Sequence, residues 1–201
     1  MVAPDRLDAL ASYAGFLATA GVERGLIGPR EVPRLWDRHL LNCALLAPLI
    51  AEGASVADLG SGAGLPGLVL AIVRPDLHVT LVEPMARRVA FLEEACARLG
   101  LPDVQIARTR AERWKPDAGY DVVTARALAP LSRLLGWSMP LVGEGGELLA
   151  MKGSSAAEEI EAAKTELRRC RGLAEIVTTA VPGVAGTTVV RVVRTADSGI
   201  G

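Results

Sequence analysis

A glycine-rich segment carries the clearest chemistry in this sequence. It runs from Asp58 to Gly67 as Asp-Leu-Gly-Ser-Gly-Ala-Gly-Leu-Pro-Gly, and its first two residues are the end of a short apolar run over 56–59. Glycines at alternate positions let the main chain approach a ligand closely while the chain turns into a helix. A carboxylate, Glu83, ends the next apolar run, where it can accept hydrogen bonds from both hydroxyls of a ribose. These features predict a site for a nucleoside-containing cofactor.

Two cofactors fit this segment. With Gly62, Gly64 and Gly67 as its glycines, it matches the G-x-G-x-x-G fingerprint of dinucleotide-binding proteins, and Glu83 would bind a ribose of NAD. Counted from Asp58, it matches the D-x-G-x-G-x-G loop of methyltransferases that use S-adenosylmethionine. We favour S-adenosylmethionine, because a dehydrogenase needs further strands or a second domain and because a terminal hairpin distinguishes the methyltransferase sheet. A tight turn without a ligand is the remaining alternative.

Basic side chains form local groups in a chain that is otherwise balanced in charge. Lys and Arg number 22 against 23 Asp and Glu, which gives a net charge of −1. This balance excludes bulk attraction to polyanions, so a nucleic-acid site must be a local patch. Arg34 and Arg38 are one helical turn apart, and Arg87 precedes Arg88 directly. These two pairs are candidate patches, and a third consists of Arg108, Arg110, Arg113 and Lys115.

Metal and membrane functions have little support. The three cysteines, Cys43, Cys96 and Cys170, are widely spaced, form no C-x-x-C pair and lie near no set of His ligands. We therefore expect neither disulfides nor a metal site, and a reducing compartment. The longest apolar stretch, 40–51, is interrupted by polar and proline residues and is too short to span a bilayer. The sequence starts without the positive charge of a secretory signal, so we expect a cytoplasmic protein.

The elements that must position these residues alternate in type after residue 55. Short apolar runs separated by helical stretches are typical of a parallel sheet with helices on both faces. The pattern predicts strands over 56–59, 79–82, 104–107, 120–124 and 147–151, and helices over 65–73, 85–99 and 131–142. The basic groups flank the carboxyl ends of these strands, where the ligand of such a sheet lies.

The two ends of the chain follow a different pattern. Two helices, over 5–20 and 33–50, precede the first strand. Near the other end, a helix over 156–171 is followed by strands over 173–179 and 187–194. Only seven residues join these strands, so they predict an antiparallel hairpin.

The chain therefore divides into three expected parts. Residues 1–52 form a helical extension packed on the domain, residues 53–195 form one α/β domain, and residues 196–201 form a tail. Half of the residues are hydrophobic, which excludes a disordered chain.

Further segments share a pattern beyond the glycine loop. They are Leu65-Pro-Gly67, Arg74-Pro75, Arg87-Arg-Val-Ala-Phe-Leu92, Arg110-Ala-Glu112, Thr124-Ala-Arg-Ala127 and Met151-Lys-Gly153. With the loop, they resemble the small-subunit ribosomal RNA guanine-N7 methyltransferases, also called the glucose-inhibited division protein B family. The resemblance extends over about 38–194. One signature departs, because the family's Arg-His-x-x-Asp-Ser reads Arg38-His-Leu-Leu-Asn-Cys43 here, so Asn42 carries no acceptor charge.

This resemblance implies a class I, Rossmann-like methyltransferase fold with a seven-stranded sheet, a C-terminal antiparallel hairpin and an N-terminal helical extension. It implies transfer of a methyl group from S-adenosylmethionine to N7 of one guanine in 16S ribosomal RNA, free or within the small ribosomal subunit. No metal and no membrane are expected. Carried over by position, the cofactor-binding residues are Asp58, Gly60, Gly62, Leu65, Glu83, Ala111, Glu112 and Arg126. Arg126 is also the expected catalytic residue, and the expected RNA-binding residues are Arg34, Arg38, Arg87, Arg88 and Lys152.

Guanine N7 agrees with what the sequence lacks. Cytosine C5 transfer needs a cysteine nucleophile in a strand-end loop, and exocyclic amine transfer usually brings an Asn/Asp-Pro-Pro-aromatic motif where this chain reads Arg126-Ala-Leu-Ala-Pro130. N7 has a free in-plane lone pair and no proton, so alignment suffices, and His39 is expected to be a hydrogen-bonded structural residue and not a base. The alternatives are a methyltransferase of the same fold acting on a small molecule or a protein, and a nucleotide-binding regulatory module without catalysis.

Overall fold

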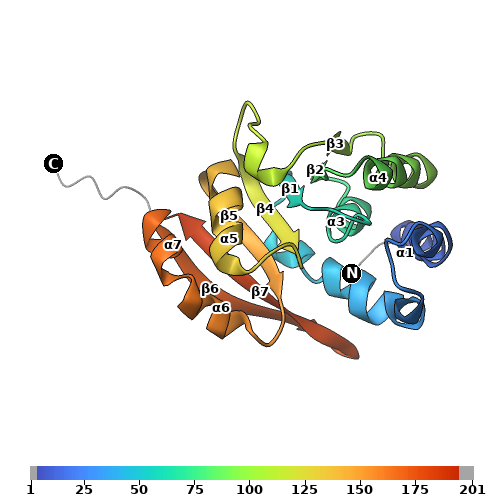
Figure 1. Ribbon diagram of the computed structural model, residues 1–201. Helices are drawn as coiled ribbons and strands as arrows, with labels where there is room; N and C mark the ends of the chain where they lie inside the picture. The colour runs from blue at the N-terminus through green and yellow to red at the C-terminus, as the bar shows by residue number, and fades with distance from the viewer. Residues whose placement is uncertain (1–3, 195–201) are drawn as a thin grey trace.

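The computed structural model describes residues 4–194, with side chains from Arg6 onward. Seven strands form one sheet in the order β3-β2-β1-β4-β5-β7-β6 (Figure 1). Their bounds are β1 Ser55–Leu59, β2 His78–Val82, β3 Gln105–Ala107, β4 Tyr120–Arg126, β5 Val142–Lys152, β6 Gly172–Val181 and β7 Val184–Arg194. Within β1 to β5, every pair of neighbouring strands is parallel. Strand β7 is antiparallel to both β5 and β6. The predicted sheet and its C-terminal hairpin are confirmed.

Each face of the sheet is covered by its own group of helices (Figure 1). The helices after β1 are α3 Gly67–Val73, α4 Ala86–Leu99, η5 Ala111–Arg113, α5 Leu131–Ser138 with η6 Met139–Leu141, α6 Ala156–Ala162 and α7 Lys164–Arg169. Helices α3 and α4 pack with the N-terminal helices in one core, whereas α5 to α7 pack in a second core. Successive strand residues point to opposite faces, so Leu149 belongs to the first core and Leu148 to the second.

The N-terminal segment consists of several short helices. Helix α1 (Pro4–Phe16) continues as a π-helical turn, η1 (Leu17–Gly21), which agrees with the helix expected over 5–20. The prediction of one helix over 33–50 is confirmed only in part, because residues 35–44 are helical without a break, whereas 33–34 and 47–49 belong to separate 3₁₀ turns. The structure has instead η2 Pro29–Arg34, η3 Leu35–Leu40, α2 Leu41–Ala44 and η4 Ala47–Leu49. Pro33 lies inside η2 and has no N–H to donate to the carbonyl four residues earlier, so a regular α-helix does not run through it.

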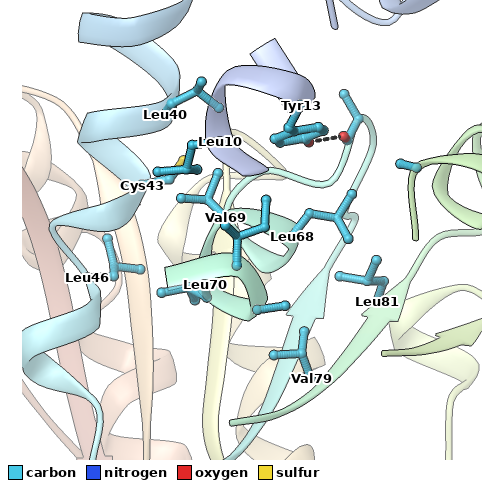
Figure 2. Packing of buried hydrophobic residues seen from close by; sticks show 14 of the residues in the cluster. Leu10, Tyr13, Leu40, Cys43, Leu46, Leu68, Val69, Leu70, Val79 and Leu81 are labelled. Atoms are coloured by element: carbon cyan, nitrogen blue, oxygen red, sulfur yellow. Dashed lines mark hydrogen bonds between the residues drawn. The ribbon is translucent and has the colours of Figure 1, made fainter. Parts of the chain in front are cut away.

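These N-terminal helices pack directly on the sheet layer. Figure 2 shows Leu10 and Leu40 in one buried cluster with Val69 and Leu70 of α3. The extension therefore covers the helix that follows the glycine segment. The division of the chain after residue 52 and after residue 195 stays a prediction, and residues 196–201 lie outside the described residues.

Arg74, which follows α3, ties the end of the extension to the start of β2. Its guanidinium donates to the carbonyl oxygens of Ala47 and Ile50, both at 2.9 Å, and of Ala51 at 3.0 Å. It also pairs with Asp76 at 2.6 Å, and this hydrogen bond holds the pKa of Asp76 well below its usual value. The contacts fix the helical layer relative to the sheet edge.

The strand boundaries differ from the prediction at β5 and at the hairpin. Strand β5 begins at Val142, five residues earlier than expected, and pairs with Tyr120 before an irregularity in the register. The sequence predicted no strand over 142–146, but a Cβ on Gly146 would lie 2.6 Å from the Tyr120 carbonyl oxygen, so the close approach of β4 requires glycine there. Only residues 182–183 separate β6 from β7, because both strands extend into the expected seven-residue loop. The helix expected over 156–171 is interrupted at residue 163.

Two classes of structural feature are absent from residues 4–194. No helix in this range combines the length and the apolar character needed to cross a membrane. The same range holds no group of three His, Cys, Asp or Glu side chains placed to bind a metal ion. Its three cysteines are free thiols.

Candidate active site at the carboxyl edge of the sheet

The glycine segment connects β1 to α3 through backbone conformations that glycine adopts most readily. Gly60, Gly62 and Gly64 have φ angles of 68°, 58° and 92°. The N–H groups of Gly60 and Ser61 donate to the Val82 carbonyl oxygen at the end of β2, at 2.8 and 3.2 Å. The loop is thereby fixed at the carboxyl edge of β1 and β2.

Asp58 lies beneath this loop and holds its far end. The side chain is fully buried, and Oδ2 accepts a hydrogen bond from the Gly67 N–H at 3.0 Å. A Cβ on Gly67 would lie 2.8 Å from that oxygen and 2.3 Å from Leu81 Cδ2, so only glycine fits. Asp58 Oδ1 has no partner among the described residues. Burial raises the pKa of Asp58 to about 7.

Tyr13 of α1 fastens the same loop from the N-terminal layer. Its hydroxyl donates to the Ala63 carbonyl oxygen, as the dashed line in Figure 2 shows. Burial raises the pKa of Tyr13 well above its usual value, so the hydroxyl keeps its proton and remains a donor. A Cβ on Gly64 would lie 2.9 Å from the hydroxyl oxygen. The helical extension is therefore in direct contact with the glycine loop.

Glu83 lies after β2 and faces the loop, where the sequence predicted it. Its side chain is only 1% exposed. Oε2 accepts from the Gly62 N–H at 3.0 Å, and Oε1 accepts from the Met85 N–H at 2.9 Å. Arg88 Nη1 lies 3.5 Å from Oε2. Both carboxylate oxygens thus already have partners in the protein.

The other predicted cofactor residues lie on neighbouring segments. Leu65 is half-buried and packs against the first core, and Ala111 is half-buried against the second. Glu112 is exposed in the same short turn as Ala111 and pairs with a neighbouring arginine at 3.6 Å. This turn follows β3, whose Ala107 carbonyl accepts the Glu83 N–H at 3.1 Å. Ala111 and Glu112 therefore come shortly after the strand that is hydrogen-bonded to Glu83.

Arg126 ends β4 and is held by the N-terminal layer. Its Nη2 lies 2.9 Å from His39 Nδ1 and 3.2 Å from the Arg38 carbonyl oxygen. Its Nη1 lies 3.5 Å from the sulfur of Cys43. His39 in turn bonds through Nε2 to Glu31 Oε2 at 2.8 Å, so it is hydrogen-bonded as expected. The guanidinium joins the edge of the sheet to the helical extension.

A cavity of about 1110 Å³ opens beside Arg126. Its polar lining consists of Arg38, Asn42, Arg126, Lys152, Ser154, Glu159, Thr187 and Thr188. Leu128, also in its wall, lies so close to Gly60 that a Cβ there would be 2.5 Å from Leu128 Cδ1. The cavity is therefore adjacent to the glycine loop, and a group bound in it would lie near a ligand bound at the loop.

The polar groups near this cavity are suited to binding and poorly suited to proton transfer. Burial raises the pKa of Cys43 to about 12, which keeps its thiol protonated. Glu159 accepts from Lys152 Nζ and from the Leu131 N–H, each at 2.7 Å. What remains toward the cavity is a set of cationic and neutral donors.

A match to a protein-family model shows which family this chain belongs to. Residues 6–183 match the model described as rRNA small subunit methyltransferase G, GidB. The chain belongs to this family. It is 62% identical over 193 residues to the ribosomal RNA small subunit methyltransferase G of Nocardioides sp., covering 95% of this chain and 77% of the relative. The namesake from Kineococcus radiotolerans is 58% identical, with coverage of 94% and 76%. The family assignment makes this chain an rRNA methyltransferase.

Solved structures with low identity support the fold of this family member. M. jannaschii TYW2 in complex with AdoMet aligns with a TM-score of 0.61 at 16% identity, over 77% of this chain and 74% of that one. A SAM-dependent O-methyltransferase from Thermotoga maritima aligns with a TM-score of 0.58 at 13% identity, over 78% and 66%. The predicted class I methyltransferase fold is confirmed.

The residues that this rRNA methyltransferase was expected to use for RNA differ in exposure. Arg34, Arg38 and Arg87 are exposed, although Arg38 lies 3.7 Å from Glu31. Arg88 is partly covered and faces Glu83. Lys152 is only 9% exposed and donates to the Ala129 carbonyl oxygen and to Glu159. Lys152 lines the cavity, but its ammonium group already has protein partners.

Three side chains at the site were missed as site residues by the sequence analysis. Tyr13, Glu31 and Leu128 contact the glycine loop, His39 and Gly60 respectively. Tyr13 lies 50 residues before its partner, and no local motif marks it. The sequence offered one signal for this part of the site, the family signature at 38–43. That signature marks the N-terminal segment that holds Arg126.

Proposed function

We propose that this chain transfers the methyl group of S-adenosylmethionine to N7 of one guanine in 16S ribosomal RNA. The cavity beside Arg126 carries the proposal, because its lining within residues 4–194 offers cationic and neutral groups and one carboxylate, Glu159, that already accepts from Lys152 and the Leu131 N–H. Guanine N7 needs no base, since its lone pair lies in the ring plane and holds no proton. Membership of the rRNA methyltransferase family supports ribosomal RNA as the substrate.

The glycine loop, Asp58 and Glu83 fit S-adenosylmethionine as the methyl donor. Gly60 and Gly62 leave the main chain open to close approach, and the carboxylate oxygens of Glu83, each of which has room to accept more than one hydrogen bond, are the proposed acceptors for ribose hydroxyls. Asp58 keeps one buried oxygen without a partner in the described part of the chain, beside a loop that would hold a cationic ligand. When bound, this cofactor supplies an electrophilic methyl group. Leu65 is proposed to line the region of methionine and ribose, and Ala111 and Glu112 that of adenine.

Other target atoms suit the same residues less well. Attack on cytosine C5 requires a thiolate, but Cys43 is fully buried and its pKa of about 12 keeps it neutral. Transfer to an amine requires removal of a proton, and Glu159 is engaged by Lys152 and a backbone N–H. These contacts favour a target atom that needs neither an enzyme nucleophile nor the removal of a proton.

Arg126 is the proposed catalytic residue. During transfer, positive charge moves onto the guanine ring, so a cation helps where it faces O6 or a phosphate and not the ring itself. The Arg126 guanidinium lines the cavity and can donate to either acceptor. In this role it aligns the base for reaction and takes no proton from it.

The exposed arginines are proposed to bind the RNA backbone. Arg34, Arg38 and Arg87 are free of buried contacts, whereas Arg88 and Lys152 would first leave Glu83 and Glu159. The substrate is 16S ribosomal RNA, free or within the small ribosomal subunit, and the reaction takes place in the cytoplasm. The proposed chemistry requires neither a metal ion nor a membrane.

The test separates transfer from binding. Labelled S-adenosylmethionine is incubated with 16S rRNA or small subunits and with the wild type, Arg126→Ala or Arg168→Ala, an exposed control on α7. At saturating RNA, Arg126→Ala is expected to lower the single-turnover rate by about tenfold or more, whereas the control is unchanged. Wild-type transfer by Arg126→Ala, or label in a protein or small molecule and not in RNA, would overturn the proposal.

A further inference from the structure

A chain of hydrogen bonds leads from Glu31 through His39 to Arg126. Glu31 Oε2 lies 2.8 Å from His39 Nε2, and His39 Nδ1 lies 2.9 Å from Arg126 Nη2. The three residues belong to η2, η3 and β4. The chain therefore crosses from the helical extension to the sheet edge and ends at a guanidinium that lines the cavity.

The direction of each bond follows from the chemistry of the partners. A guanidinium only donates, so His39 Nδ1 must accept from Arg126. An imidazole whose Nδ1 accepts is neutral and carries its proton on Nε2. That proton is then donated to the Glu31 carboxylate, which only accepts when ionised. The two neighbours together select one tautomer of His39.

We infer that His39 is a positioning residue that aims the Arg126 guanidinium into the cavity, and that Glu31 fixes the tautomer needed for this. The inference rests on the proposed role of Arg126 in methyl transfer. His39 has no contact with the reacting atoms and removes no proton. It acts by supplying a neutral acceptor at a fixed place, so that Nη2 is held by His39 and the Arg38 carbonyl oxygen, and the donors of Arg126 outside these bonds and the contact with Cys43 can face the substrate.

The charges around His39 keep it in this form. It faces Glu31 of η2, Arg38 of its own turn and Arg126 of β4, with Cys43 and Asp58 beyond Arg126. Burial and the two guanidinium groups lower the pKa of His39 below its usual value of 6.5, against the opposing effect of Glu31. Protonation in acid would place an N–H of His39 against an N–H of Arg126 and break the bond.

Two near-isosteric variants separate this role from a merely structural one. In His39→Asn, the side-chain oxygen can occupy the place of Nδ1 and still accept from Arg126, but the link to Glu31 is lost. In His39→Gln, the longer side chain reaches Glu31 at the place of Nε2, but no acceptor remains opposite Arg126. A structural role for His39 favours the Gln variant, whereas a positioning role favours the Asn variant.

The experiment measures single-turnover methyl transfer to 16S rRNA or small subunits at saturating RNA and S-adenosylmethionine, from pH 5.5 to 8.5. At pH 7.5, His39→Asn is expected to stay within about threefold of the wild type, and His39→Gln to fall by about tenfold or more. As the pH falls below 6.5, the wild-type rate should decline, whereas the Asn variant, which has no group to protonate here, should stay flat. Titration of Asp58 affects both proteins alike, so the comparison cancels it.

Equal rates for the two variants, or a faster Gln variant, would overturn the inference, as would an acid decline that persists in His39→Asn. If His39→Gln fails to fold, as judged by thermal unfolding, the pH comparison between the wild type and His39→Asn decides alone. A single-turnover rate in Arg126→Ala equal to that of the wild type would instead contradict the proposed function. Loss of transfer in Arg126→Ala with no difference between the two His39 variants contradicts the positioning role alone.

Discussion

Two buried carboxylates lie close to the glycine loop and differ in how their oxygens are satisfied. Both oxygens of Glu83 accept from backbone N–H groups, whereas Asp58 has one bonded oxygen and one without a partner in the described residues. A buried charge with an unsatisfied oxygen is costly, which agrees with the raised pKa of Asp58. The two residues therefore predict different experimental signatures.

Replacement of Glu83 should weaken the binding of S-adenosylmethionine. Glu83→Ala removes the proposed acceptor for ribose and also the acceptor of the Gly62 N–H, so we expect a loss of about 1.5 to 3 kcal/mol in binding free energy. Calorimetry with the cofactor measures it. Arg88→Ala is the matched control, because it removes the ion pair and leaves the carboxylate, and should not weaken binding. NAD should not bind, and tight NAD binding would contradict the cofactor assignment.

Asp58 should make the free protein less stable as the pH rises. With a pKa of about 7 when folded and an ordinary value of 3.8, the folded state holds a proton that the unfolded state loses between these values. Its contribution to the unfolding free energy is complete below about pH 4 and is lost as the pH rises toward 7. Asp58→Asn, relative to the wild type, should therefore gain about 2 to 3 kcal/mol in unfolding free energy between pH 5 and pH 8. Urea unfolding without cofactor tests this, and an equal difference at both pH values would contradict it.

At the scale of elements, α1 acts as a support for the cofactor loop. Tyr13→Phe leaves the Ala63 carbonyl oxygen without its buried donor, at an expected cost of about 1 to 3 kcal/mol in the free energy of unfolding. Because that carbonyl belongs to the glycine loop, affinity for S-adenosylmethionine should fall as well. Chemical unfolding and calorimetry measure the two effects.

Tyr120→Phe is the matched control for this prediction. It removes the same hydroxyl group from another tyrosine, whose partner is Thr80 Oγ1 at 3.1 Å on the sheet. This change should leave cofactor affinity as it is in the wild type. If Tyr13→Phe binds the cofactor as tightly as Tyr120→Phe does, α1 does not support the loop.

Some elements of this fold can be predicted from local sequence pattern, and others depend on tertiary contacts. Strands β1, β2 and β4 are short apolar runs bounded by turn residues, and local pattern was enough to find them and the glycine loop. Strand β5 begins in a stretch with glycines where local pattern predicted no strand, although the neighbouring strand requires glycine there. The short N-terminal helices depend on Pro29 and Pro33 and on packing against α3, which no periodicity reveals. Contacts such as Glu31 with His39 and Tyr13 with Ala63 arise only from the tertiary structure.

At the scale of the molecule, the helical extension and the sheet build the site together. The extension supplies Tyr13 to the loop and His39 to Arg126, and Arg74 fastens it to the start of β2. Two of its exposed arginines, Arg34 and Arg38, lie on the consecutive turns η2 and η3, and Arg38 lines the cavity. RNA bound to these arginines would therefore be near the reacting base.

RNA binding should depend on salt through these exposed arginines. Replacement of Arg34 or Arg87 by Ala should weaken RNA binding, leave cofactor affinity unchanged, and lower the slope of log affinity against log salt by about 0.7 to 0.9 for each lost phosphate contact. Arg168→Ala, on the far helix α7, should leave the slope as it is. Filter binding over a range of salt concentrations gives the slopes, and an unchanged slope for both variants would place the RNA elsewhere.

The central claim is that the methyl group reaches N7 of one guanine in 16S ribosomal RNA, and mapping of the product tests it most directly. Small-subunit rRNA without the modification, free or in subunits, is incubated with the wild-type chain and labelled S-adenosylmethionine, digested to nucleosides and mapped by position. If the methyl group is transferred to N7, the label appears as 7-methylguanosine at a single position. Label in a cytosine, in an exocyclic amine or at many positions would contradict it.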